Sequence, residues 1–217
     1  MTARWLAGRC VRVVLAALTL AGGLITIAPG AASASTCVSW TGIQPPNPGS
    51  DNLLLGVAVL TPCNAWAVGT FSTLTASRTL IEHWNGTAWK VVPSPNPSST
   101  GNFLFGVAAT SAGNAWAVGD YENGTADRTL IEHWNGTAWK VVPSPNPGGS
   151  AGNVLSGVAA TSAGNAWAVG DYSIGGQEQM LIEHWNGTAW KVVPSPNPAG
   201  SAGNRLFGVA ATSAGNA

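Results

Sequence analysis

An internal repeat constrains this chain more than any other feature of its sequence. The eighteen residues from Leu80 to Pro97 return letter for letter at 130–147 and again at 181–198, so the period is 50 residues and then 51. A repeat of this length is one supersecondary unit of a solenoid, a propeller or an array, and it buries its apolar faces against its neighbours. The repeat therefore constrains the architecture closely and the chemistry very little.

Turn signals divide each repeat into four short strands, named A to D here. In the second repeat the expected strands are A at 104–110, B at 114–119, C at 129–134 and D at 138–142. Asn-Gly between strands C and D is a strong hairpin signal because both residues tolerate positive φ, and the proline run after strand D cannot continue a ladder. No window shows the 3.6-residue apolar period of a helix. The sequence therefore predicts an all-β, β-propeller-like array of four-stranded antiparallel blades.

These motifs resemble the repeats of kelch and galactose-oxidase-type propellers. The shared features are an apolar strand ending in glycine, an aromatic residue before a turn, a tryptophan opening the outer strand and an exit rich in proline. The tryptophans that match are Trp84, Trp134 and Trp185 before the turn, and Trp89, Trp139 and Trp190 after it. One departure is that the second glycine of the family pattern is Thr70, Asp120 or Asp171 here. The resemblance implies a propeller over nearly all of 37–217.

The repeat also sets the expected domain boundaries. Residues 35–217 form the propeller region, with blades expected at 52–97, 102–147 and 153–198, a lone outer strand at 37–48 and a truncated blade at 204–217. The lone strand is inferred because Trp40–Pro48 aligns with Trp89–Pro97. This count predicts an incomplete propeller, a fragment of a longer one. The alternatives are self-association through the open blade faces, or a four-blade ring with a degenerate last blade.

Residues 1–34 have the pattern of a secretory signal peptide. Three arginines precede an apolar run, and Ala32-Ser33-Ala34 is a small-x-small cleavage site. The apolar run of about 15 residues is shorter than the roughly 20 that a membrane span needs. We therefore expect a secreted protein with no membrane association after cleavage. Cys37 and Cys63 then remain as an even pair in an oxidising compartment, which predicts a disulfide between them.

Charge excludes one class of partner. Without the three arginines of residues 1–34, six basic residues face nine acidic ones, so the mature net charge is near −3. No basic patch is present to neutralise phosphates, and nucleic acid is not expected as a partner.

The repeated polar residues favour structural roles. Each Glu-His pair, such as Glu82-His83, occurs in every repeat, whereas an enzyme needs one asymmetric site, and adjacent strand residues point to opposite faces. We expect a hydrogen bond or salt bridge between neighbouring blades. Tryptophans at fixed strand positions are expected in the core. Asp120 and Asp171, with Glu122, supply too few oxygens for calcium. The sequence thus predicts no catalytic residues, no metal and no cofactor.

The loop between strands B and C differs among the repeats, as does the entrance to strand A. Loops on a rigid scaffold usually hold binding specificity, although drift without selection would produce the same variation. The candidate contact residues are Tyr121, Glu122, Asp127, Tyr172, Gln177 and Glu178. Two functions follow as hypotheses. The first is a secreted, non-catalytic binding or scaffold module that engages protein or glycan through these loops. The alternative is a fragment of an extracellular propeller enzyme, glycan-active or oxidase-type, whose catalytic residues lie outside this sequence.

Overall fold

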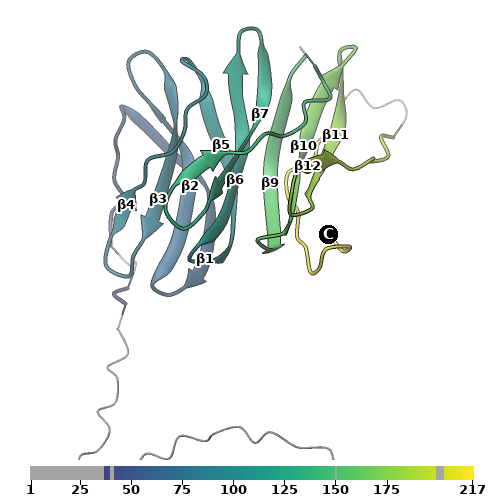
Figure 1. Ribbon diagram of the computed structural model, residues 1–217. Coiled ribbons are helices and arrows are strands. Elements are labelled where there is room, and N and C mark those ends of the chain that lie inside the picture. Colours follow the sequence, from purple (N-terminus) through teal and green to yellow (C-terminus); the bar gives the residue numbers. More distant parts are fainter. Residues whose placement is uncertain (1–36, 40–41, 150, 199–202) are drawn as a thin grey trace, which may run out of the picture. The chain divides into compact units, whose positions relative to one another are not determined.

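Three four-stranded antiparallel sheets follow one another along the chain (Figure 1). The computed structural model describes residues 37–39, 42–149, 151–198 and 203–217. Within each sheet the strands lie in chain order, so each sheet is a meander of strands A, B, C and D. The predicted all-β, propeller-like array of blades is confirmed. The expected signal peptide at 1–34 lies outside the described residues.

The strands occupy the same positions in all three repeats. Blade 1 contains β1 (Asp51–Thr61), β2 (Asn64–Ser72), β3 (Ser77–Trp84) and β4 (Trp89–Val91). Blade 2 contains β5 (Asn102–Ser111), β6 (Asn114–Asn123), β7 (Ala126–Trp134) and β8 (Trp139–Val141). Blade 3 contains β9 (Asn153–Ser162), β10 (Asn165–Ile174), β11 (Gln177–Trp185) and β12 (Trp190–Val192). Strands B and C extend further into their connecting loop than the sequence predicted, and strand D is shorter.

Strand D begins one residue later than predicted because the C–D turn is longer than a two-residue hairpin. Asn85 does not adopt positive φ, whereas Gly86 does, at 93°. The Asn85 Oδ1 atom accepts hydrogen bonds from the backbone N–H groups of Thr87 and Ala88, both at 3.0 Å. The side chain therefore closes a loop over 85–88, and the sequence expectation of positive φ at both turn residues is wrong at the asparagine.

A β-bulge shapes the inner half of every blade. The register of β5 against β6 shifts between Leu104 and Gly106, and β1 and β9 shift at the equivalent place. The shift brings a carbonyl against the glycine of strand B: a Cβ on Gly119 would lie 2.0 Å from the Phe103 oxygen. Only glycine fits there. The extra residue of each bulge, Leu55 in blade 1 and Phe105 in blade 2, comes to lie beside a cleft described below.

The core lies between the blades. Each blade has a trailing face, which carries the strand-B tryptophan, and a leading face, which carries the strand-B alanines. Trp66 of blade 1 is 1 % exposed and packs against Trp134 and Trp139 of blade 2, with ring centroids 5.0 and 5.1 Å apart. Trp116 packs on blade 3 in the same way. The prediction that tryptophans at these strand positions are core residues is confirmed for Trp66, Trp116 and Trp139, whereas Trp167 is only partly buried.

The inner strands approach one another through a column of glycines. A Cβ on Gly106 would lie 3.2 Å from the Gly157 Cα atom, and one on Gly157 would lie 3.1 Å from the Gly208 Cα atom. Residues near Gly208 thus take the position of the inner strand of a fourth repeat, although 204–211 form no strand. An isolated bridge between Ser213 and Asn216 repeats the A–B turn of the other blades. The sequence predicted a truncated blade at 204–217, and this segment forms no ladder of strands.

The described part of 37–48 is not in a strand, contrary to the expectation of a lone outer strand, and Trp40 lies outside the described residues. In the blades strand D pairs with strand C of its own sheet, and the described chain gives residues 42–48 no such strand. The Val38 N–H instead donates to the Gly86 carbonyl at 3.0 Å.

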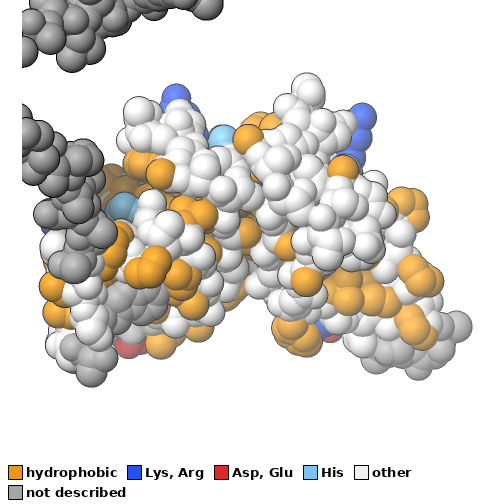
Figure 2. Space-filling view, turned by 90° about the horizontal axis from the view of Figure 1, so that it is seen from below, with side chains coloured by type: hydrophobic (Ala, Val, Ile, Leu, Met, Phe, Trp, Pro, Cys, Tyr) orange, Lys and Arg blue, Asp and Glu red, His pale blue; other side chains and the backbone are white. Residues whose placement is uncertain are grey.

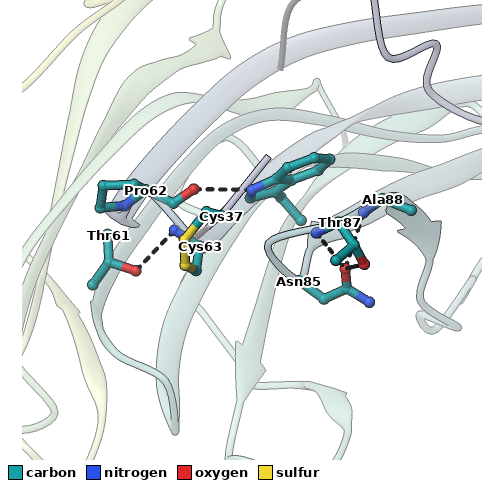
Figure 3. Close-up of a disulfide and its surroundings, with 8 residues drawn as sticks. Cys37, Thr61, Pro62, Cys63, Asn85, Thr87 and Ala88 are labelled. Carbon is teal, nitrogen blue, oxygen red and sulfur yellow. Dashed lines mark hydrogen bonds between the residues drawn. A yellow bond between two sulfur atoms is a disulfide. The ribbon is translucent and has the colours of Figure 1, made fainter. Parts of the chain in front are cut away.

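The Cys37–Cys63 disulfide fixes this N-terminal segment to blade 1, as predicted, and the two Cα atoms are 5.3 Å apart (Figure 3). Cys63 lies in the turn between β1 and β2, beside Pro62, whose carbonyl accepts a bond from the Trp84 indole N–H at 3.0 Å. Among the described residues no helix is long and apolar enough to cross a membrane.

Candidate functional site

A cleft of about 550 Å³ opens where the B–C loops meet the inner strands. Asp127 reaches it from β7 in blade 2, and Glu178 from β11 in blade 3. Phe105 and Phe207 contribute apolar walls from two inner-strand positions. The cleft therefore combines acidic and aromatic side chains from several repeats, and the repeats differ at these positions.

One cation faces the acidic groups of this B–C cleft. Arg205 forms an ion pair with Glu178, in which the guanidinium donates to both carboxylate oxygens. This bond holds the pKa of Glu178 below its ordinary value. The pKa of Asp171, also in the cleft, is raised by burial and by Glu178, with Arg205 acting against the rise. Asp127 has no ion pair among the described residues, so the cleft keeps an uncompensated negative charge.

A second buried carboxyl stands close to the cleft. Asp120 is 5 % exposed, and burial together with the charges of Asp127, Glu122 and Asp171 raises its pKa to about 7. Blade 1 has Thr70 at the same position, where its hydroxyl donates to the carbonyl of Arg78 at 2.9 Å. Burial is the larger cause of this rise, and the neighbouring carboxylates of the cleft add to it.

The six predicted contact residues do not form one site. Asp127 and Glu178 line the B–C cleft, while Tyr121 and Glu122 line a smaller cleft of about 340 Å³ with residues 97–100. Tyr121 and Tyr172 also pack against the first and second inter-blade cores. Gln177 is exposed at the start of β11. Both tyrosines therefore contribute to packing between blades, and Tyr121 also lines the smaller cleft.

The aromatic wall of the cleft is absent from the contact residues that the sequence suggested. Leu55, Phe105, Ser156 and Phe207 occupy one repeat position and all line the cleft. Their position varies directly before the constant Gly-Val-Ala of strand A, which is a signal that the sequence contained. The β-bulge breaks the two-residue alternation of strand A. Alternation alone therefore does not show that the bulged residue turns towards this cleft.

In the described part of the chain the Glu-His pairs form no hydrogen bond or ion pair between blades, which corrects the sequence expectation. His133 Nε2 hydrogen-bonds Asn114 Oδ1 at 2.7 Å within its own blade, and its ring stacks on Trp116 at 4.1 Å. Glu132 pairs in register with Ala117, so it points from the leading face towards blade 1. Its carboxyl oxygens are buried and have no protein hydrogen-bond partner, and burial raises its pKa to about 8.

Metal binding finds no support in the described ranges. Across 37–39, 42–149, 151–198 and 203–217, no group of three or more histidine, cysteine, aspartate or glutamate side chains is placed to hold a metal ion.

Comparison with known proteins gives a structural similarity and no family. No family model matches the chain, and no curated protein matches it either. Among solved structures, one of YCF48 bound to D1 peptide is similar with 16 % sequence identity and a TM-score of 0.45. The similarity covers 69 % of this chain and 41 % of that one, so this chain spans about two fifths of that structure's length. The propeller-like architecture stated here rests on the three repeated sheets themselves.

Proposed function

We propose that this chain is a secreted, non-catalytic binding module that holds a protein ligand in the B–C cleft. One observation supports this most directly: the cleft is lined by positions at which nearly identical repeats differ, including Asp127, Glu178, Arg205 and Phe207. A scaffold built from copies of one unit becomes asymmetric only where the copies differ. Asymmetry is what a specific ligand requires, and rigid scaffolds usually place it on their loops.

The lining indicates the kind of ligand. Acidic Asp127 and Asp171 lie beside apolar Phe105, Val154 and Phe207. A polypeptide segment with a lysine or arginine next to apolar side chains complements both kinds of wall. A glycan is less well matched, since sugar rings stack best on tryptophan, and the residues that line this cleft include no tryptophan.

Secretion is part of the same proposal. The basic start, apolar run and cleavage site of residues 1–34 support export, and so does the Cys37–Cys63 disulfide, which persists in oxidising compartments. The kelch-type assignment is supported by sequence motifs alone. Intact mass of the protein recovered from the culture medium would test export, because cleavage after Ala34 leaves a chain that starts at Ser35.

Ligand selection from a peptide library tests the binding role. Selected peptides should be enriched in basic residues flanked by apolar ones, and their affinity should fall with added salt. Asp127→Asn and Phe207→Ala should each weaken binding about tenfold or more. Phe207 is 73 % exposed, so its truncation should leave the fold intact.

Two matched variants serve as controls. Glu122→Gln removes the same charge from the smaller cleft, and Leu74→Ala truncates a fully exposed residue of the blade 1 loop, so binding should persist in both. Equal losses in cleft and control variants, or selection of glycans over peptides, would contradict the proposal.

A further inference from the structure

The sequence Asn-Gly-Thr occurs four times in this chain, and the structure separates one copy from the other three. Three copies are the C–D turns, which begin at Asn85, Asn135 and Asn186. The fourth begins at Asn123 in the B–C turn of blade 2, whereas the B–C loops of blades 1 and 3 contain no Asn-Gly. All four asparagines are exposed, so a difference in their reactivity has to come from the local structure.

In the C–D turns the asparagine side chain is held by the backbone that follows it. Asn135 Oδ1 accepts hydrogen bonds at 3.0 Å from the N–H groups of Thr137 and Ala138, and Asn186 Oδ1 accepts the equivalent pair. Figure 3 shows the same arrangement at Asn85. These bonds fix the torsions of the asparagine side chain and of the turn around it.

The C–D turns are also packed against the A–B turns of their own blades. A Cβ on Gly136 would lie 3.5 Å from the Gly113 Cα atom, and one on Gly187 would lie 3.7 Å from the Gly164 Cα atom. The B–C turn of blade 2 is open by comparison, because a Cβ on Gly124 would meet no atom within 4 Å.

Asn123 is the copy without these restraints. It ends β6 and pairs with Ala126 across a two-residue turn, in which Gly124 has a φ of 71°. Positive φ at the first central residue alone is typical of a type II′ turn. Among the described residues the Asn123 side chain has no hydrogen-bond partner, so its amide is free to rotate towards the Gly124 nitrogen.

We propose that Asn123 is a site of spontaneous deamidation, and that the asparagines of the three C–D turns are protected from the same reaction. The Gly124 backbone nitrogen attacks the Asn123 Cγ atom and forms a five-membered imide. The Cγ–Nδ2 bond breaks, and the side-chain nitrogen leaves as ammonia with the proton of the Gly124 N–H. Water then opens the imide and leaves aspartate or isoaspartate. Glycine favours the attack because it has no side chain to hinder its nitrogen.

The product carries a new carboxylate at the smaller cleft. Asn123 lines this cleft of about 340 Å³ together with Tyr121 and Glu122, so the proposal is independent of the B–C cleft. Charged side chains are few on the face that Figure 2 shows, and only 8 % of all residues are charged. One more negative charge beside Glu122 is therefore a large local change. Deamidation converts the loop of blade 2, slowly and without an enzyme, into a more acidic form.

Incubation of the folded protein at mildly alkaline pH, followed by trypsin digestion and mass spectrometry, tests the proposal. Cleavage after lysine and arginine places each of the four triplets on a peptide of its own. Asn123 should convert about tenfold faster than Asn135 or more, because the Oδ1 bonds of Asn135 have to break before its imide can close. In reduced protein unfolded by urea, the four triplets should convert at similar rates.

Two matched variants locate the reaction by the release of ammonia. Asn123→Gln should remove the fast phase, because the extra methylene of glutamine disfavours imide formation, while Asn135→Gln should leave the fast phase unchanged. Similar rates at all four triplets of the folded protein, or a fast phase that persists in Asn123→Gln, would overturn the proposal. Faster conversion in the C–D turns would also overturn it, since the bonds to Oδ1 would then activate the amide rather than hold it.

Discussion

At the scale of single residues, the buried glutamates are the least expected feature of this protein. Glu82, Glu132 and Glu183 are fully buried, and their carboxyl oxygens have no protein hydrogen-bond partner. Strand alternation correctly predicted that each glutamate and its neighbouring histidine point to opposite faces. It could not predict burial of the carboxyl, because burial depends on what packs against that face of the sheet rather than on the strand.

These carboxyls should make stability depend on pH. Burial raises the pKa of Glu132 from 4.5 to about 8, so the folded state prefers the protonated form. Stability from this group is complete below about pH 4.5 and declines as the pH rises through 8, by roughly 5 kcal/mol. Glu132→Gln should therefore flatten the fall of the free energy of unfolding between pH 5 and 8, measured by urea denaturation.

Other groups titrate in the same range, so the wild-type slope should diminish in this variant and not vanish. They include Glu82, whose pKa is about 7, and Glu183, whose pKa is about 8. Asp51→Asn, which changes an exposed carboxylate at the start of β1, should retain the full slope. An unchanged slope in Glu132→Gln would show that this carboxyl is ionised in the folded protein.

At the scale of elements, blade 1 differs from blades 2 and 3 because a disulfide joins it to the N-terminal segment. Cys63 replaces the glycine that blades 2 and 3 have in the A–B turn, and it bonds to Cys37. A Cβ on Gly86, across from this turn, would lie 3.1 Å from the Cys63 Cβ atom, so the two turns of blade 1 are in close contact. The disulfide thus attaches residues 37–39 to the end of the blade that is opposite the B–C loops.

Removal of this disulfide should lower stability and loosen the N-terminal segment. The bond closes a loop of 26 residues in sequence separation, which corresponds to about 3 kcal/mol in the chain-entropy description. The double variant Cys37→Ser/Cys63→Ser should lose stability of that order in urea denaturation. Amides near Val38 should exchange faster, while those of β6 and β10 keep their protection. Uniform loss of protection across all three blades would contradict a local role.

At the scale of the whole molecule, the period of the sequence was enough to predict the blades. Turn residues located four strands per repeat, and tryptophans at constant positions predicted the inter-blade core. The cleft was predicted only in part. Asp127 and Glu178 were identified because they lie in loops that differ, whereas Phe105 and Phe207 were missed because a bulge sets their direction. Side-chain direction at an irregular backbone is not encoded in a two-residue period.

Identical blade faces also affect how the chain finds its native arrangement. Because the trailing face of blade 1 matches that of blade 2, a folding chain gains similar packing when blade 3 docks one repeat out of place. Misassembly between like units is the characteristic folding error of such arrays. Cys63 is present in the first repeat alone, so its bond to Cys37 is possible for only one repeat. Formation of the disulfide therefore stabilises only the arrangement in which residues 37–39 lie on the first blade.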